Sequence, residues 1–103
     1  MKDLSNKVAI ITGSSSGVGA ATARLFASLG CHVVINYNAN SAGARRAAKD
    51  CEQLGAETVF FGGRVANATN CVAMVKAGMG KWGRFDILVN NAGPTKFVRH
   101  NNH

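Results

Sequence analysis

A glycine-rich loop between an apolar run and a helical pattern restricts the possible folds of this chain more than any other segment. Residues 7–12 read KVAIIT, a near-continuous apolar run that is typical of a strand covered on both faces. Residues 12–19 read TGSSSGVG, and apolar residues at helical spacing begin at Val18. A strand, a glycine-rich turn and a helix in this order indicate a nucleotide-binding α/β fold.

The loop itself has the chemistry of a phosphate site. A phosphate is bound by backbone N–H groups and by the positive end of a helix dipole. Glycines permit a tight turn and a close approach of the backbone, and serine hydroxyls add donors without bulk. We therefore predict that the phosphates of a nucleotide cofactor bind at Gly13, Ser14, Ser15, Ser16, Gly17, Val18 and Gly19.

The rest of the chain alternates short β-like runs with helical stretches, the pattern of βαβ units and a parallel sheet. Right-handed crossovers give a Rossmann-type wound sheet with the strand order 3-2-1-4 and three helices. We expect residues 1–103 to form a single, partial α/β domain. Strands are predicted at residues 7–12, 32–36, 58–61 and 85–90, and helices at residues 18–29, 41–54 and 68–82, with Ser41 as an N-cap.

Each predicted helix has an apolar stripe that should face the sheet. Small residues dominate the second stripe, so we expect that helix to pack close to the sheet. The predicted stripes are Val18, Ala21, Leu25 and Leu29 in the first helix, Ala44, Ala47, Ala48, Cys51 and Leu54 in the second, and Val72, Val75, Met79 and Trp82 in the third.

Little chain follows the predicted fourth strand. In a complete doubly wound sheet this strand is central and paired on both sides. Here it would present a bare apolar edge, and such an edge is a site of aggregation or pairing. We therefore expect an incomplete sheet, self-association through the fourth strand and an irregular tail at about residues 94–103.

The composition excludes several classes of protein. The net charge is +7, but the basic residues are scattered and are not interleaved with aromatic residues as on a nucleic-acid-binding surface. No apolar run approaches the roughly 20 residues of a membrane-spanning helix, and the N-terminus has no signal-peptide core. Three cysteines without a C-x-x-C pair indicate reduced thiols, and His100 and His103 lack further metal ligands. We expect a cytoplasmic protein that binds no metal, membrane or nucleic acid.

A second motif indicates which family the chain resembles. The loop has the spacing G-x-x-x-G-x-G, and residues 90–93 read NNAG at the end of the predicted fourth strand. Together these motifs resemble those of the short-chain dehydrogenase/reductase family over residues 5 to about 98. The resemblance implies an NAD(P)-dependent oxidoreductase that transfers hydride between a nicotinamide cofactor and a carbonyl or alcohol substrate. It also implies that Asn90, Ala92 and Gly93 contact the cofactor, largely through their backbone.

The segment after the second predicted strand favours NADP(H) over NAD(H). An NAD site normally carries Asp or Glu about 20 residues after the glycines. Residues 36–41 read NYNANS and contain no carboxylate to repel a 2′-phosphate, whereas Asn36, Asn38 and Ser41 can donate to one. Arg45 and Arg46 either supply positive charge at this phosphate or only solvate an exposed helix face.

The segment after the third predicted strand departs from the family pattern. Relatives usually carry an Asp there that binds the adenine amino group, whereas this chain has Arg64 followed by Val65. An arginine cannot accept that hydrogen bond. Arg64 therefore either stacks on the adenine or weakens the site, while Val65 offers its backbone N–H.

The catalytic residues that the resemblance implies are not found in these 103 residues. The family uses a tyrosine, a lysine, a serine and an asparagine, and these lie beyond the NNAG motif. No Tyr-x-x-x-Lys occurs here, and the only tyrosine is Tyr37. We assign no catalytic residue and expect a truncated short-chain oxidoreductase that is inactive by itself. The alternative is a non-catalytic nucleotide-binding or subunit-interaction module.

Overall fold

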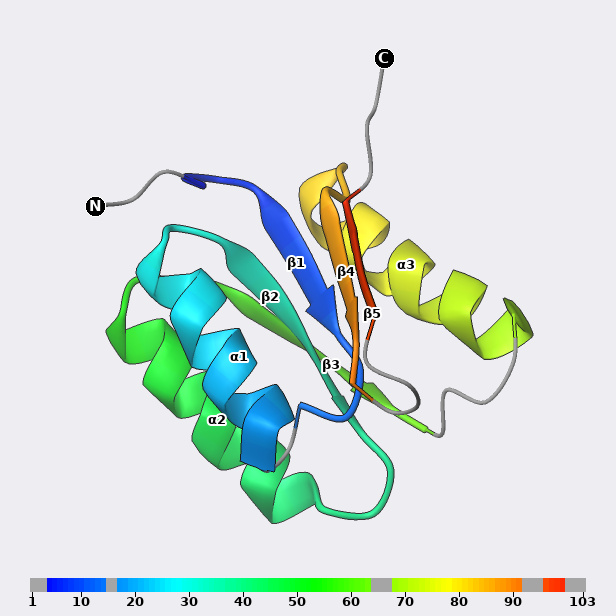
Figure 1. Ribbon diagram of the computed structural model, residues 1–103, viewed down its shortest axis with the longest axis horizontal. Helices are drawn as coiled ribbons and strands as arrows, with labels where there is room; N and C mark the ends of the chain where they lie inside the picture. The colour runs from blue at the N-terminus through cyan, green and yellow to red at the C-terminus, as the bar shows by residue number, and fades with distance from the viewer. Residues whose placement is uncertain (1–3, 15–16, 64–67, 92–95, 100–103) are drawn as a thin grey trace.

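The structure is a computed structural model that describes residues 4–14, 17–63, 68–91 and 96–99 (Figure 1). Within these ranges, no helix is long and apolar enough to cross a membrane. The described strands form one five-stranded sheet. In chain order the elements are β1 (Val8–Ile11), α1 (Gly17–Ser28), β2 (His32–Tyr37), α2 (Ser41–Gln53), β3 (Thr58–Gly62), α3 (Ala68–Trp82), β4 (Ile87–Asn90) and β5 (Lys96–Arg99).

The strand order β3-β2-β1-β4-β5 puts β1 inside the sheet, between β2 and β4. β1 pairs in parallel with β2, where Val8 lies opposite His32, and with β4, where Ile10 lies opposite Leu88. All four residues of β1 are buried, as its apolar run predicted. The predicted α/β fold and the strand order 3-2-1-4 are confirmed.

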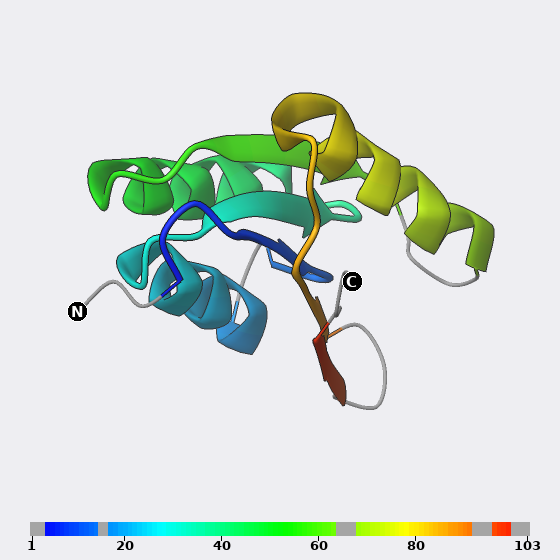
Figure 2. The ribbon, with the colours of Figure 1, turned by 90° about the horizontal axis from the view of Figure 1, so that it is seen from above.

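Helices cover both faces of the sheet, as Figures 1 and 2 show. α1 and α2 lie side by side on one face, where their buried residues pack against Ala9 and Val33. α3 covers the other face, where Met74 packs against Ile10 and Val34. Neighbouring residues of one strand point to opposite faces, so β1 and the middle of β2 are buried on both sides of the sheet.

The fourth strand is not at the edge of the sheet. β5 pairs with β4 in antiparallel orientation, with Ile87 opposite Arg99 and Asn90 opposite Lys96. The prediction of an irregular tail is therefore wrong for residues 96–99, and the prediction of a bare fourth-strand edge is wrong as well. Residues 96–99 read KFVR, and two apolar residues between two charged ones show no strand pattern, so only the pairing with β4 reveals β5. The predicted self-association through the fourth strand loses its structural basis.

α1 buries a different stripe from the predicted one. Val18 is 71% exposed and Leu25 is 57% exposed, so neither faces the sheet. The buried residues are Gly19, Ala20, Ala23, Phe26 and Ala27. Four of these five are Gly or Ala, and their small side chains let the helix axis approach the sheet closely. Close packing thus outweighs the burial of larger side chains on this helix.

α2 buries most of its predicted stripe but begins differently from the prediction. Ala44, Ala47, Ala48 and Cys51 are buried, while Leu54 is 41% exposed. The N-cap is Asn40 and not Ser41, because the Oδ1 atom of Asn40 accepts a hydrogen bond from the backbone N–H of Gly43 at 2.9 Å.

α3 faces the sheet with Met74 and Gly78, which are both buried. The predicted stripe is wrong at Val72 and Met79, which are 52% and 44% exposed. Gly78 favours the close approach of this helix, because an added Cβ would lie 3.2 Å from the Cγ2 atom of Val34, a tight contact. The helix axis therefore lies close to β2.

Candidate functional site

The candidate site lies where the carboxyl ends of β1, β2 and β4 meet. β1 continues into the glycine loop, and α1 begins at Gly17 beside the end of the strand (Figure 1). Asn36 lies near the end of β2, and Asn90 and Asn91 lie at the end of β4. Ligands of open α/β sheets bind outside the carboxyl ends of the strands, at the topological switch point where the strand order reverses.

Two glycines determine the path of the loop. Gly13 has a φ of +60°, in the left-handed region that favours glycine. At Gly19, an added Cβ would overlap the carbonyl oxygen of Gly13 and would lie 2.8 Å from the Nδ2 atom of Asn91. The first turn of α1 therefore lies directly against the loop and the end of β4.

Asn36 holds the loop from the β2 side. Its side chain is buried, and its Oδ1 atom accepts a hydrogen bond from the backbone N–H of Gly13 at 2.8 Å. Its Nδ2 atom donates to the carbonyl oxygens of Phe61 and Gly63, both at 3.0 Å. The amide thus uses both of its N–H groups within the protein, which leaves no donor for the predicted contact to a 2′-phosphate.

Ser14 fastens the loop to the same strand. Its hydroxyl donates to the carbonyl oxygen of Ile11 and accepts from the backbone N–H of Asn36, both at 2.8 Å. Its backbone N–H donates to the carbonyl oxygen of Asn36 at 2.9 Å. Because Ser14 is fully buried, its hydroxyl is part of the loop's internal structure and does not face a ligand.

Thr12 joins the loop to β4 on the other side. Its Oγ1 atom donates to the Oδ1 atom of Asn90 at 3.1 Å and accepts from the backbone N–H of Asn91 at 2.7 Å. The Nδ2 atom of Asn91 also donates to the carbonyl oxygen of Gly13 at 3.4 Å. The two motifs of the sequence are therefore in direct contact. The sequence reasoning missed Thr12 and Asn91 as functional residues, although both stand inside those motifs.

Among the described residues of the loop region, the first turn of α1 is the part that can bind an anion. The first N–H groups of a helix have no partner within the helix, and the dipole makes this end positive. The first turn of α1 contains no acidic residue, and Gly17 and Val18 are exposed. No group of three or more metal-ligating side chains occurs among the described residues. The site thus combines backbone amides with neutral or basic side chains.

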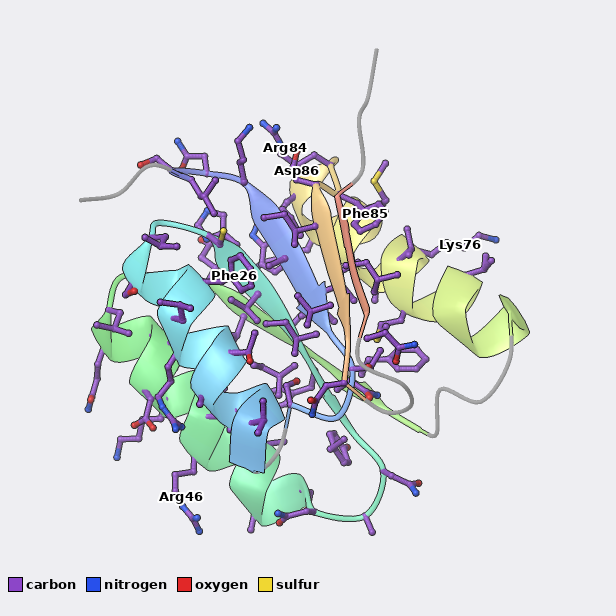
Figure 3. All side chains as sticks on the ribbon, in the orientation of Figure 1. Phe26, Arg46, Lys76, Arg84, Phe85 and Asp86 are labelled. Atoms are coloured by element: carbon purple, nitrogen blue, oxygen red, sulfur yellow. The ribbon has the colours of Figure 1, made fainter. Side chains whose placement is uncertain are left out.

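A pocket of about 310 Å³ lies between α1 and α2, next to the loop. Its lining includes Gly17 and Arg24 of α1 and Arg46 of α2, together with the capping residue Asn40. Arg24 lies 3.5 Å from Asp50, and both side chains are about two fifths exposed. Arg46, labelled in Figure 3, is exposed on α2 and adds a second arginine to the lining of this pocket. The pocket is therefore basic.

The other predicted site residues fall into two groups. Asn38 and Ser41 are exposed after the end of β2, at the same edge of the sheet as the loop. Arg45 is exposed on α2 but does not line the pocket. The predicted contacts of Ser15, Ser16, Arg64, Val65, Ala92 and Gly93 lie outside the described residues.

Comparisons with known proteins agree on one family. Residues 7–103 match the family model of short chain dehydrogenases. The chain is 37% identical over 98 residues to an uncharacterized oxidoreductase of Methylorubrum extorquens. It is 38% identical over 96 residues to a 3-oxoacyl-[acyl-carrier-protein] reductase of Synechocystis. These alignments cover 95% and 93% of this chain but 40% and 39% of the relatives, so the chain spans about two fifths of their length.

Solved structures show the same similarity. A hydroxysteroid dehydrogenase from Escherichia coli matches 88% of this chain with a TM-score of 0.77 and 34% identity, over 38% of its own length. A dehydrogenase from Burkholderia cenocepacia, solved with bound NADP, matches 87% of this chain with a TM-score of 0.79 and 29% identity, over 35% of its own length.

Proposed function

The chain belongs to the short-chain dehydrogenase family, and on that premise we propose that it binds the dinucleotide cofactor of an NAD(P)-dependent oxidoreductase. The proposed reaction is hydride transfer between the nicotinamide and a carbonyl or alcohol substrate. One observation carries the proposal: β2 and β4 hold the glycine loop from both sides, while the first turn of α1 is left to bind phosphate.

The residues at this edge fit the pyrophosphate of such a cofactor. The N–H groups of Gly13 and Ser14 are already bonded to Asn36, so they shape the loop and do not bind the ligand. The N–H groups of Gly17, Val18 and Gly19 lie in the first helical turn and have no helical partner. The bound cofactor would supply the hydride, and these amides would hold its phosphates in place.

NADP(H) is the cofactor that the charges favour. Residues 36–41 carry no carboxylate, and the pocket beside them is lined by Arg24 and Arg46. We propose that the 2′-phosphate lies at this pocket, with Arg46 and the exposed Asn38 and Ser41 as donors. The residues between the described ranges remain predicted contacts: Arg64 and Val65 at the adenine, and Ala92 and Gly93 at the ribose and nicotinamide.

Two neighbouring arginines provide the test of this proposal. Arg46 lines the pocket and Arg45 does not, although both are exposed cations on α2. Arg46→Ala should raise the Kd for NADPH about 10- to 150-fold, because a charge-assisted hydrogen bond contributes about 1.5–3 kcal/mol. The same change should leave the Kd for NADH unaltered, and Arg45→Ala should change neither value. Calorimetric titration of the chain measures all of these constants. Failure of the chain to bind either dinucleotide would overturn the proposed function.

Turnover is a separate question from binding. Tyr37 is the only tyrosine of these 103 residues, and no lysine stands four residues after it. Its ring lies against Gly62, where an added Cβ would lie 2.8 Å from the phenolic oxygen. We therefore expect the 103-residue chain to bind NADPH without oxidising it in the presence of a carbonyl substrate. Steady loss of NADPH absorbance with this chain would contradict that expectation.

The alternative of a subunit-interaction module depended on a free edge of the fourth strand. β5 occupies that edge, so no observation favours this alternative.

A further inference from the structure

We propose that Asn36 is a positioning residue for the cofactor, which sets the shape of the glycine loop and thereby the affinity for the pyrophosphate. Its side chain then makes no contact with a 2′-phosphate, contrary to the role that the sequence suggested. This inference rests on the proposed function.

The surroundings of the Asn36 side chain determine its orientation. The residue is only 3% exposed. One end of the amide faces an N–H group, that of Gly13, and the other end faces two carbonyl oxygens, those of Phe61 and Gly63. Only one of the two amide orientations satisfies all three partners, because oxygen must face the donor and nitrogen the acceptors. The side chain is therefore locked between the loop and the ends of β2 and β3.

The locked amide can act on the phosphate site through Gly13. Asn36 holds the N–H of Gly13, a residue with a φ of +60° that, as glycine, can adopt many other backbone conformations when this hydrogen bond is lost. The carbonyl oxygen of Gly13 lies directly against Gly19 in the first turn of α1. A shift of Gly13 therefore moves the turn whose amides would bind the pyrophosphate. The chain of contacts runs from Asn36 through Gly13 to Gly19.

The position of Asn36 predicts a particular pattern of cofactor affinities. NAD(H) and NADP(H) share the pyrophosphate and differ only at the ribose 2′ position. A residue that acts on the loop should therefore affect both cofactors by the same factor. A residue that donates to the 2′-phosphate should affect NADP(H) alone. Asn38 is exposed two residues further along the chain, so it offers a matched control.

The experiment compares Asn36→Ala with Asn38→Ala by titration of NADH and NADPH. Thermal unfolding first confirms that each variant is folded at the temperature of the titration. If the variant loop holds its binding geometry about one tenth of the time, the Kd rises about tenfold. We expect this increase for both cofactors in Asn36→Ala, and an increase for NADPH alone in Asn38→Ala. If Asn36→Ala does not fold, Asn36→Ser and Asn38→Ser form a less drastic, uncharged pair for the same comparison.

Hydrogen exchange gives a readout that does not depend on the cofactor. The amide proton of Gly13 should be protected in the unaltered chain and should exchange much faster in Asn36→Ala, while the amide proton of Ile10 in β1 stays protected in both. Uniform loss of protection across the sheet would show general destabilisation and would overturn the positioning role.

The binding outcomes separate this inference from the proposed function. A loss confined to NADPH in Asn36→Ala, or unchanged affinity for both cofactors, would overturn the inference while the proposed function stands. If the unaltered chain binds neither cofactor, the proposed function and the pyrophosphate role fail together, and the exchange of Gly13 alone still decides whether Asn36 shapes the loop.

Discussion

The carbonyl oxygen of Gly13 lies in the space that a Cβ atom of Gly19 would occupy. The two residues stand at opposite ends of the turn between β1 and α1. Their contact lets the chain reverse from a strand into a helix whose first amides face the edge of the sheet. The glycine at position 19 is thus required by the tertiary contact itself, and not by its own φ angle.

This contact predicts the effect of a methyl group at position 19. Gly19→Ala should destabilise the fold by about 1–3 kcal/mol, because the clash is with backbone atoms that have little room to move. The variant should also lose affinity for NADPH. The control is Gly80→Ala in α3, where an added Cβ meets no atom within 4 Å and the change should stabilise the helix by about 0.4–1 kcal/mol. Urea unfolding measures the free energy of unfolding of both variants. Equal changes in the two variants would contradict the close contact between Gly13 and Gly19.

Neighbouring residues on α1 test which face of that helix is buried. Phe26, labelled in Figure 3, is 9% exposed and packs in the core under α1, whereas Leu25 is 57% exposed. Phe26→Ala should lower the free energy of unfolding by about 3–5 kcal/mol. Leu25→Ala should change it by only about 0.5 kcal/mol, as for other surface positions. The opposite ranking in chemical denaturation would support the stripe that the sequence predicted.

Asp86 connects the start of β1 with the segment before β4. Its carboxylate accepts hydrogen bonds from the backbone N–H of Val8 at 2.9 Å and from the Nε and Nη2 atoms of Arg84 at 2.8 Å (Figure 3). Burial alone raises the pKa of Asp86, but the hydrogen bonds from Arg84 and Val8 and the nearby positive charges outweigh burial and hold that pKa below its ordinary value. The folded state therefore favours the ionised carboxylate.

The lowered pKa of Asp86 predicts a loss of stability in acid. The unfolded chain takes up a proton at this carboxyl at about pH 4, whereas the folded chain does so only at lower pH. The contribution of Asp86 is therefore complete at neutral pH and disappears as the pH falls through the folded-state pKa. Urea unfolding at a series of acidic pH values should show a smaller loss for Asp86→Asn than for the unaltered chain. Asp50→Asn, at the half-exposed pair with Arg24, is the charge-matched control.

The thiols of Cys31 and Cys51 should be unreactive in the folded chain. Both residues are fully buried, and burial raises the pKa of each thiol from 9.0 to about 11. The thiolate is the reactive form, so alkylation at mildly basic pH should be slow until the chain unfolds. Mass spectrometry after iodoacetamide treatment, with and without urea, measures this difference. Rapid labelling of either thiol without urea would contradict its burial.

Much of the fold could be predicted because the signals for it are local. The first four strands, the helices and the strand order 3-2-1-4 follow from apolar periods and glycine positions, which are properties of neighbouring residues. The apolar stripes of α1 and α3 could not be predicted as reliably, because two faces of each helix carry apolar residues. On α1, the choice depends on whether Val18 and Leu25 or the smaller Ala20 and Ala23 allow closer contact with the sheet.

By itself, the sequence predicted where the proposed phosphate site lies, because a glycine loop between a strand and a helix has one place in a wound sheet. Only the tertiary structure decided what each polar residue of the site does. Gly13 and Asn36 are 23 positions apart, and Thr12 and Asn91 are 79 positions apart, yet each pair is hydrogen-bonded. Whether a side chain has a donor or acceptor left for a ligand depends on such distant partners. Residue type alone suggested Asn36 as a ligand contact, whereas in the fold its side chain is bonded to the loop and to the end of β3.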